Sequence, residues 1–214
     1  MEEKDIKEKI VNGARDLFLK YGIRSVSMDD IARQLSVSKK TIYQYFADKD
    51  EIVTQVALEY LKDDKCQFDK LVEGTRNALE ELIRMSLFLK ARLQQVNPTL
   101  MFDLQKFHGK AWSEWVNYKQ THVRKETVRN IKQGIAEGLF RSDLNPEIIA
   151  TMRLEMVQMV FDTDLFPANV FNLYEVHMQL FDQFVYGLLT EKGRKQYEKF
   201  KQEPNNLELI PNHA

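Results

Sequence analysis

Residues 27–49 read SMDDIARQLSVSKKTIYQYFADK, and this stretch decides the fold. It contains two short segments with helical spacing of apolar residues, 28–35 and 39–45, joined by only three residues. Ser27 and Ser38 stand immediately before these segments, where a hydroxyl oxygen can accept a hydrogen bond from a free N–H of the first turn. Two capped helices with a tight connection predict a helix-turn-helix.

The apolar and polar side chains of this stretch fall into two sets. The apolar set holds the two helices together, and it comprises Ile31, Ala32, Leu35, Val37, Ile42 and Phe46. The polar set remains on the second helix, and it comprises Lys39, Lys40, Thr41, Tyr43, Gln44 and Tyr45. Lysine neutralises phosphate or donates to guanine, glutamine pairs with adenine, and the threonine methyl group meets the thymine methyl group. We therefore expect the second helix to enter the major groove of DNA.

A purely structural alternative exists for several of these residues. Ile42 and Tyr45 are also suited to packing, and Lys39 with Lys40 is also typical of a solvated helix start. The spacing and the caps together favour DNA binding over this alternative.

The distribution of charge agrees with a DNA-binding segment. The whole chain has 214 residues, 31 basic and 32 acidic, and a formal net charge of −1. Residues 20–49 nevertheless hold six basic and only three acidic side chains. The near-neutral total is therefore an average over a basic N-terminal part and a slightly acidic remainder.

Outside the helix-turn-helix the sequence indicates an all-α fold. Proline is absent before Pro98, and no stretch alternates apolar and polar residues in the manner of a strand. We expect helices over 5–21, 28–35, 39–45, from 49 onward, 76–95, 100–107, 110–137, 147–161 and 171–190. Gly22 ends the first helix, and the polar tail 204–214 is expected to be flexible.

Several classes of protein are disfavoured. Cys66 is the single cysteine, which excludes an internal disulfide framework and a cysteine-based zinc cluster. Four histidines lack an i, i+4 partner, so no metal site is expected: His108, His122, His177 and His213. No Gly-rich phosphate loop or catalytic constellation indicates an enzyme, and no cofactor is expected. The charged N-terminus and the lack of long apolar runs favour a cytoplasmic protein without a membrane partner.

The sequence resembles the TetR family of bacterial transcriptional regulators over its first ~50 residues. Four short matches carry the resemblance: Phe18, Tyr21 and Gly22; then SMDDIA at 27–32; then Val37-Ser38; then TIYQYF at 41–46 followed by Lys49. The resemblance implies an N-terminal three-helix DNA-binding domain, followed by a C-terminal helical bundle for ligand binding and dimerisation.

The resemblance also implies a role for each matching residue. Lys39, Thr41 and Gln44 approach bases, and Lys40 stands where many members have glycine or proline. Tyr43, Tyr45, Ser27 and Lys49 hold phosphates. The full predicted DNA-binding set is Ser27, Ser38, Lys39, Lys40, Thr41, Tyr43, Gln44, Tyr45 and Lys49.

In the C-terminal part the resemblance is thinner. GIAEGLF at 134–140 and DLNP at 143–146 resemble the turn between the seventh and eighth helices of the family. By the same resemblance, the helices 147–161 and 171–190 pair with a second subunit. Their apolar stripes suit an interface or a monomer core equally: Ile148, Met152, Met156 and Met159; then Leu173, Val176, Leu180, Phe184 and Leu188. A two-fold dimer places its recognition helices ~34 Å apart, one turn of DNA.

Aromatic and methionine residues provide candidates for a hydrophobic effector pocket. They are Met85, Phe88, Phe102, Phe107, Trp112, Trp115, Tyr118 and Met156, and each is equally suited to the core. On another helix face Lys125, Arg129 and Lys132 suit either solvent or an anion.

The sequence therefore predicts two domains, a reader at 1–50 and a sensor and dimerisation domain at 51–203, linked by the helix that starts near 49. The predicted function is a homodimeric repressor that binds palindromic operator DNA and is released by a hydrophobic small molecule. An activator, or a regulator controlled by a protein partner, is the alternative.

Overall fold

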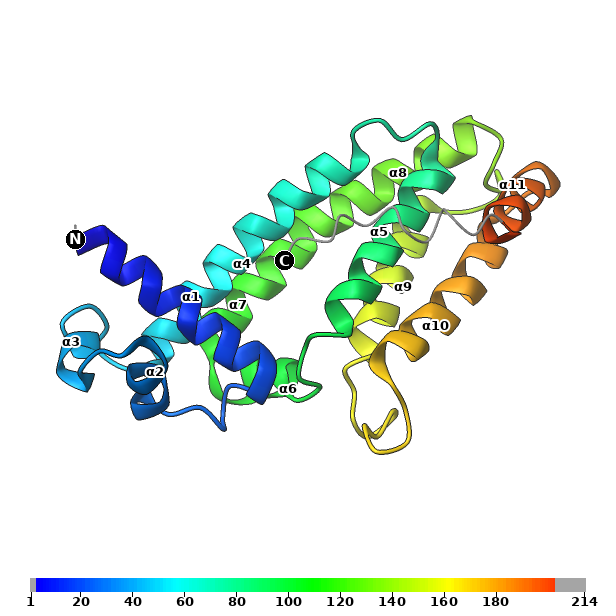
Figure 1. Cartoon of the computed structure of the whole chain (residues 1–214). Coiled ribbons are helices and arrows are strands. Elements are labelled where there is room, and N and C mark those ends of the chain that lie inside the picture. Colours follow the sequence, from blue (N-terminus) through cyan, green and yellow to red (C-terminus); the bar gives the residue numbers. More distant parts are fainter. Residues whose placement is uncertain (1–2, 203–214) are drawn as a thin grey trace. The chain divides into compact units, whose positions relative to one another are not determined.

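The chain is built from helices, which confirms the predicted all-α class. A computed structural model describes residues 3–202 (Figure 1), and the predicted flexible tail 204–214 lies outside this range. Within the described range, the one pairing of strand type is an isolated antiparallel bridge between Phe140 and Leu189. No helix in the described range is both long and apolar enough to cross a membrane.

Two compact units make up the chain. The first comprises residues up to Asp64 together with Gln95–Tyr118, and the second comprises Lys65–Gln94 together with the residues from Lys119 onward. The predicted reader, 1–50, lies wholly in the first unit. The segment 95–118 also belongs to this unit, which the sequence did not indicate.

The first unit contains the expected helix-turn-helix. Its helices are α1 (Glu3–Tyr21), α2 (Met28–Leu35), α3 (Lys39–Tyr43), the first part of α4 (Lys49–Val72), α6 (Leu100–Phe107) and α7 (Gly109–Tyr118). In Figure 1, α2 and α3 lie beside α1 at the blue end of the chain. Buried side chains from successive elements form the core of this part: Ile10, Ala14 and Phe18, then Ile31 and Ala32, then Ile42 and Phe46, then Ile52 and Val53.

Two glycines allow α1 to fit against the rest of this core. A Cβ atom at Gly13 would lie 2.6 Å from Cδ2 of Leu35, so a larger residue there would require the Leu35 side chain to move. Gly22 has a φ of +80°, the left-handed conformation that ends α1 as the sequence predicted.

The segment 95–118 is tied to the first unit by polar contacts. The Asn97 N–H donates to the Leu19 carbonyl oxygen at 2.7 Å. The Arg24 N–H donates to Oδ2 of Asp103 at 3.0 Å, and Asp103 is itself buried. His108 Nδ1 lies 2.7 Å from Oδ1 of Asp50, in the first turn of α4. The loop after α1 and the start of α4 are therefore held by α6 and its neighbours.

The second unit is a helical bundle. Besides the end of α4, it contains α5 (Ala78–Leu93), the π-helical turn η1 (Lys119–Val123), α8 (Arg124–Ala136), α9 (Pro146–Met159), α10 (Leu173–Leu188) and α11 (Glu191–Gln202). α5 packs against α8 and α10, and α9 packs against α8 and α10. The helix expected over 110–137 is therefore two α-helices with the π-helical turn between them.

The apolar stripe of α10 is part of the core of this unit. Leu173, Val176, Phe184 and Leu188 are all buried within the chain. On α9, by contrast, Ile148 is 65% exposed and Met152 is 45% exposed. The structure thus favours the core alternative for α10 and leaves the first two residues of the α9 stripe on the surface.

Helix α11 was not expected from the sequence, which placed the last helix at 171–190. Its composition is strongly polar, and its inward face is limited to Gly193, Tyr197 and Phe200. It is held by two tyrosines: the buried Tyr197 donates to Oδ1 of Asp182 at 2.9 Å, and Tyr186 donates to Glu198. Burial and the Asp182 carboxylate raise the pKa of Tyr197.

His177 is the fully buried histidine of α10. Its Nε2 atom lies 2.9 Å from Oγ of Ser86 and 3.2 Å from the Ser86 carbonyl oxygen. Burial lowers the pKa of His177 to about 3, and the positive charge of Arg153 acts in the same direction. The folded protein therefore holds this imidazole in its neutral form.

This burial predicts acid sensitivity of the fold. When the chain unfolds, the pKa of His177 returns to 6.5, so the unfolded state takes up a proton that the folded state refuses. The free energy of unfolding should fall as the pH drops from 6.5 toward 3, by at most about 1.4 kcal/mol per pH unit from this group. His177→Gln should flatten that slope in urea titrations at several pH values. An unchanged slope in the variant would show that other groups cause the acid sensitivity.

Candidate nucleic-acid interface

The start of α2 is closed by the cap that the sequence predicted. Ser27 Oγ accepts from the Asp30 N–H at 3.2 Å, and the Ser27 N–H donates to Oδ2 of Asp30 at 2.9 Å. The Ser27 hydroxyl also donates to the same carboxylate, and these hydrogen bonds lower the pKa of Asp30. This reciprocal capping box fixes the first turn of an eight-residue helix.

The turn between α2 and α3 depends on one left-handed residue. Ser36 has a φ of 54°, an uncommon conformation for a residue with a Cβ atom. The Val37 N–H donates to the Ala32 carbonyl oxygen at 3.0 Å, which closes the end of α2. Ser38 then begins α3, and its Oγ accepts from the Thr41 N–H at 3.0 Å.

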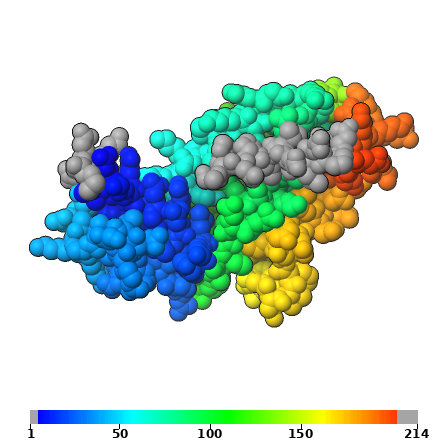
Figure 2. All heavy atoms as spheres, viewed as in Figure 1, coloured from blue at the N-terminus to red at the C-terminus, as the bar shows by residue number. Residues whose placement is uncertain are grey.

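Helix α3 presents most of the predicted polar set to solvent. Lys39, Lys40 and Gln44 are exposed, and Tyr43 is 48% exposed. Thr41 and Tyr45 are half-buried, and Ile42 is fully buried beneath them. α3 ends at Tyr43, two residues earlier than expected. The blue and light-blue spheres in Figure 2 show that α2, α3 and their connections form part of the outer surface of this unit.

Lys39 is paired with a carboxylate in the free chain. Its Nζ atom donates to Oδ2 of Asp29 at 2.9 Å, and this bond raises the pKa of the lysine. Both side chains are well exposed, so the pair is screened by solvent and easily exchanged for a phosphate. Lys40 is exposed beside it, and no carboxylate of the described residues lies within ion-pair distance of its ammonium group.

Lys49 is directed into the protein rather than to the surface of α3. Its Nζ atom donates to the Ile23 carbonyl oxygen at 2.6 Å and lies 5.9 Å from the centroid of the Phe18 ring. Burial lowers the pKa of this lysine, and the charges of Asp103 and Asp30 partly oppose that shift. The ammonium group joins the first turn of α4 to the loop after α1, and a phosphate would have to compete with this bond.

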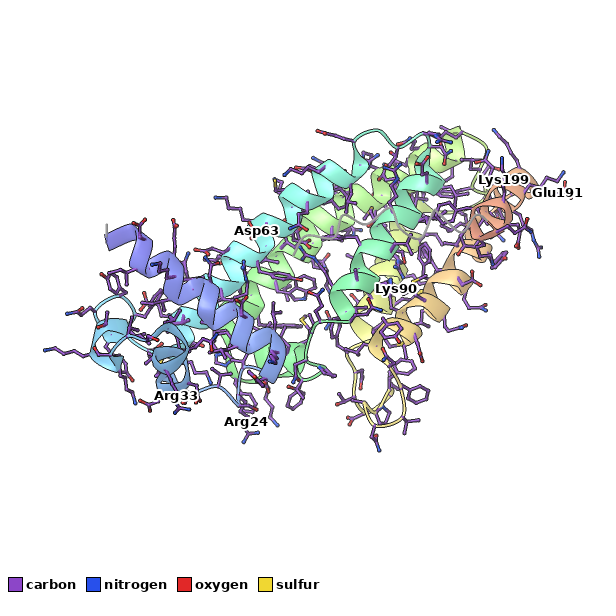
Figure 3. All side chains as sticks on the ribbon, in the orientation of Figure 1. Arg24, Arg33, Asp63, Lys90, Glu191 and Lys199 are labelled. Atoms are coloured by element: carbon purple, nitrogen blue, oxygen red, sulfur yellow. The ribbon has the colours of Figure 1, made fainter. Side chains whose placement is uncertain are left out.

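Two further cations adjoin this surface. Arg24 and Arg33 both point away from the ribbon in Figure 3, Arg24 from the loop after α1 and Arg33 from α2. Arg33 Nη1 lies 3.5 Å from Oδ1 of Asp30, with 78% of its side chain exposed. In the sequence these two residues contributed only to the basic excess of 20–49, since neither lies in the four short matches to the TetR family.

The predicted effector-lining residues are divided between the two units. Met85, Phe88 and Met156 belong to the second unit, and Phe102, Phe107, Trp112, Trp115 and Tyr118 belong to the first. Phe102 and Phe107 are exposed and contact each other edge to face. Tyr118 donates to Oδ2 of Asp64 at 2.8 Å. The eight residues therefore do not line one cavity within either unit.

A hollow of about 440 Å³ lies instead against α8, and it is lined by Gln120, Arg124, Lys125, Val128, Arg129, Lys132 and Glu147. Two of its cations are already paired. Arg129 is bound by Glu81 and Glu126, and Arg124 lies 2.9 Å from Glu147. The basic face noted at Lys125, Arg129 and Lys132 is thus partly neutralised from within the chain. Across residues 5–202, no three histidine, cysteine, aspartate or glutamate side chains gather as a metal site would require.

Comparison with known proteins agrees with this geometry. The sequence pattern of the bacterial regulatory proteins of the tetR family matches residues 10–56, which span α1 to the start of α4. The chain is 24% identical over 180 residues to YvaF of Bacillus subtilis, an uncharacterized HTH-type transcriptional regulator; the match covers 78% of this chain and 88% of that protein. It is 26% identical over 139 residues to the transcriptional repressor KstR2 of Mycobacterium tuberculosis, covering 64% and 70%.

The N-terminal part of the chain, residues 10–56, is the DNA-binding domain of the TetR family. The chain is accordingly a helix-turn-helix transcriptional regulator, and the family and its relatives are regulators rather than enzymes. Among solved structures, a putative transcriptional regulator from Saccharomonospora viridis has the same fold, with a TM-score of 0.74 at 17% identity over 88% of this chain and 100% of that one.

Substitutions of base-reading and of phosphate-binding residues should have different effects on DNA binding by this regulator. Gln44→Ala removes an exposed amide of α3, so it should relax the preference at one base position by about 1–3 kcal/mol. Lys40→Ala should weaken binding to all sequences and lower the slope of log affinity against log salt by about 1. Selection from a random DNA pool, followed by titrations at several salt concentrations, measures both effects.

Lys62→Ala is the matched control, because Lys62 is an exposed lysine of α4 outside this surface. A Gln44→Ala protein with an unchanged base preference would contradict the assignment of α3 as the reading helix.

Lys49 should act mainly as an internal brace. Lys49→Met removes the hydrogen bond to the Ile23 carbonyl oxygen, so the free energy of unfolding should fall by about 1–3 kcal/mol. The salt slope of DNA binding should stay within error of the original. Urea unfolding and salt titrations test this, with Lys62→Met as control. A salt slope lowered by about 1 at unchanged stability would instead identify Lys49 as a phosphate contact.

Proposed function

We propose that this regulator is a homodimeric repressor, which a small molecule releases from a palindromic operator. Residues 1–50 read the DNA, and 51–203 carry the sensor and the subunit interface. The exposed apolar face of α9 is the single observation that supports a dimer. One helix-turn-helix reads too short a sequence on its own, so a two-fold dimer in turn implies a palindromic operator.

This face is unusual for an isolated chain. Ile148 and Met152 are one turn apart on α9, and both are largely exposed although they are bulky and apolar. Leu165, Val170 and Phe171 in the following connection are exposed as well. Neighbouring apolar residues of this size commonly mark a protein interface. Burial against the same face of a second copy would create a two-fold interface.

Release by an effector is supported by the contacts inside the first unit. Asp103 of α6 binds the backbone of the loop after α1, and His108 binds Asp50 in the first turn of α4. A ligand that displaced α6 or α7 would shift both partners and so move the recognition helix. An effector that favours the displaced state lowers the affinity for DNA by population shift.

The relatives support the remaining parts of the proposal. KstR2, which the chain resembles over 64% of its length, is a transcriptional repressor. The Saccharomonospora viridis regulator with the same fold was solved in complex with choline, a small molecule. Both observations favour a repressor with a small-molecule effector over an activator or a protein-controlled regulator.

Charges on the α9 face should abolish the dimer and the tight binding of DNA. Two aspartates in Ile148→Asp/Met152→Asp would oppose their own copies across a two-fold axis, so the protein should sediment as a monomer. Operator affinity should fall by about 10²–10⁴-fold, because the second helix-turn-helix no longer binds within the same complex.

Leu58→Asp is the control, since Leu58 is an exposed apolar residue of α4 that belongs to the first unit. A double variant that remains dimeric would reject this interface. Deletion of the gene should raise transcription of the target, whereas a fall would identify an activator.

A further inference from the structure

Arg153 of α9 lies inside the second unit, and no described residue provides it with an anionic partner. Only 7% of the residue is exposed. Its guanidinium carbon lies 5.2 Å from the ring centroid of Phe181 and 5.4 Å from that of Phe184, both on the inner face of α10. In residues 5–202 its buried Nη1 atom finds no hydrogen-bond acceptor. Contact with two aromatic rings offsets only part of the cost of removing a guanidinium from water.

Other cationic side chains of this unit, unlike Arg153, have carboxylate partners. Arg129 is held by two carboxylates, those of Glu81 and Glu126, and the ammonium group of Lys119 lies 3.1 Å from Glu155. Arg153 is more deeply buried than either of them, yet no carboxylate in the described part of the chain lies within ion-pair distance of it. Within the described residues the guanidinium therefore has no carboxylate to pair with.

A second unpaired group lies at the same place. His177 is one turn before Phe181 on α10, and its ring stacks on that phenyl ring with a centroid distance of 6.3 Å. Its Nδ1 atom has no partner in residues 5–202. Nδ1 carries a proton in the tautomer in which the Ser86 hydroxyl donates to Nε2, whereas donation from Nε2 to the Ser86 carbonyl oxygen leaves Nδ1 as an acceptor. The imidazole and the guanidinium both contact the Phe181 ring, and with Nδ1 protonated both offer an N–H suited to an oxyanion.

The material around these donors is apolar. Met156 stands one turn after Arg153 on α9, and it packs against the same buried cluster as Phe181 and Phe184. Val160 and Val176 belong to a second buried cluster on the same two helices. A ligand placed here would have one charged end and an otherwise hydrophobic body.

We propose that Arg153 and His177 bind the carboxylate of an apolar organic acid, which enters the second unit between α5, α9 and α10 and acts as the effector. This proposal rests on the repressor function proposed above and specifies the chemistry of its ligand. The proposal also requires the ligand to be negatively charged, because the guanidinium would repel a cationic ligand.

A carboxylate from a second copy of the chain fits this position less well. The guanidinium contacts Phe181, which is 1% exposed, and acts on His177, which is 0% exposed. The exposed residues of α9, Ile148 and Met152, are the ones that a second copy would cover. A side chain of that copy would have to pass α9 to reach the donors.

Three matched series of ligands test the charge preference. Straight-chain carboxylates of eight to fourteen carbons, the alcohols of equal length and the alkyltrimethylammonium ions of equal length are titrated calorimetrically against the full chain, below their micellar concentrations. At least one carboxylate should bind tenfold or more tightly than its alcohol, and the ammonium ions should bind no better than the alcohol. Equal binding in all three series, or no binding by any carboxylate, would overturn the proposal.

Variants at the proposed site test the residue. Arg153→Met should lower the carboxylate affinity to that of the alcohol and leave the alcohol affinity unchanged, while Arg153→Lys should keep part of the difference. Arg76→Met is the control, since Arg76 has 87% of its side chain exposed in the same unit. Circular dichroism and thermal melting establish that each variant is folded. If Arg153→Met does not fold, the lysine variant and His177→Phe decide, and undiminished carboxylate binding in both would overturn the proposal.

Sedimentation and DNA binding distinguish a failure of the ligand proposal from a failure of the proposed repressor function. If Arg153→Met sediments as a monomer, the guanidinium serves the subunit interface, and the ligand proposal is overturned. DNA binding by the full chain is measured in the same samples. Loss of operator binding on adding the carboxylate supports the proposal. Operator binding without any carboxylate binding leaves the repressor intact and rejects only this ligand, whereas carboxylate binding without operator binding rejects the repressor.

Discussion

The recognition helix exists only because a small core holds it. α3 has five residues and α2 has eight, and helices this short are unstable on their own in water. Ile42 fixes α3 by complete burial, and Ile31 does the same for α2. Serine caps then satisfy the first free N–H groups of each helix. Every polar side chain offered to DNA depends on these few apolar contacts beneath it.

The same unit connects this reading surface to residues that follow much later in the chain. Asp103 and His108 reach the loop after α1 and the first turn of α4, and Asn97 reaches the end of α1. Lys49 completes the arrangement, since its ammonium group holds the Ile23 carbonyl oxygen beside that loop. A displacement of the segment 95–118 therefore acts on the position of the reading helices through short hydrogen bonds rather than through α4 alone.

The second unit combines an apolar core with a few buried polar groups, and their partners differ. Arg129 and Tyr197 have carboxylate partners, which stabilise the packing of α8 and α11 on their neighbours. His177 and Arg153 lie between α5, α9 and α10, and each has a buried nitrogen atom that finds no partner in residues 5–202. A buried group without a partner lowers stability, so its presence is more readily understood as recognition than as packing.

The sequence by itself determined the elements whose signals are local. The caps at Ser27 and Ser38, the stop at Gly22 and the division of α3 into a buried Ile42 and exposed polar residues follow from neighbours within one or two turns. Those signals also fixed the family, because the reading motif is contiguous.

Only the tertiary structure decided the features that depend on residues far apart in the chain. Helix α11 has only a short apolar face and is held by contacts with α10. The ammonium group of Lys49 turns inward because the Ile23 carbonyl oxygen lies within its reach. The same holds for Arg153, which looks like a surface residue in the sequence until α10 covers it with two phenyl rings. Burial and pairing are properties of the packed chain, and a residue's immediate neighbours in sequence do not encode them.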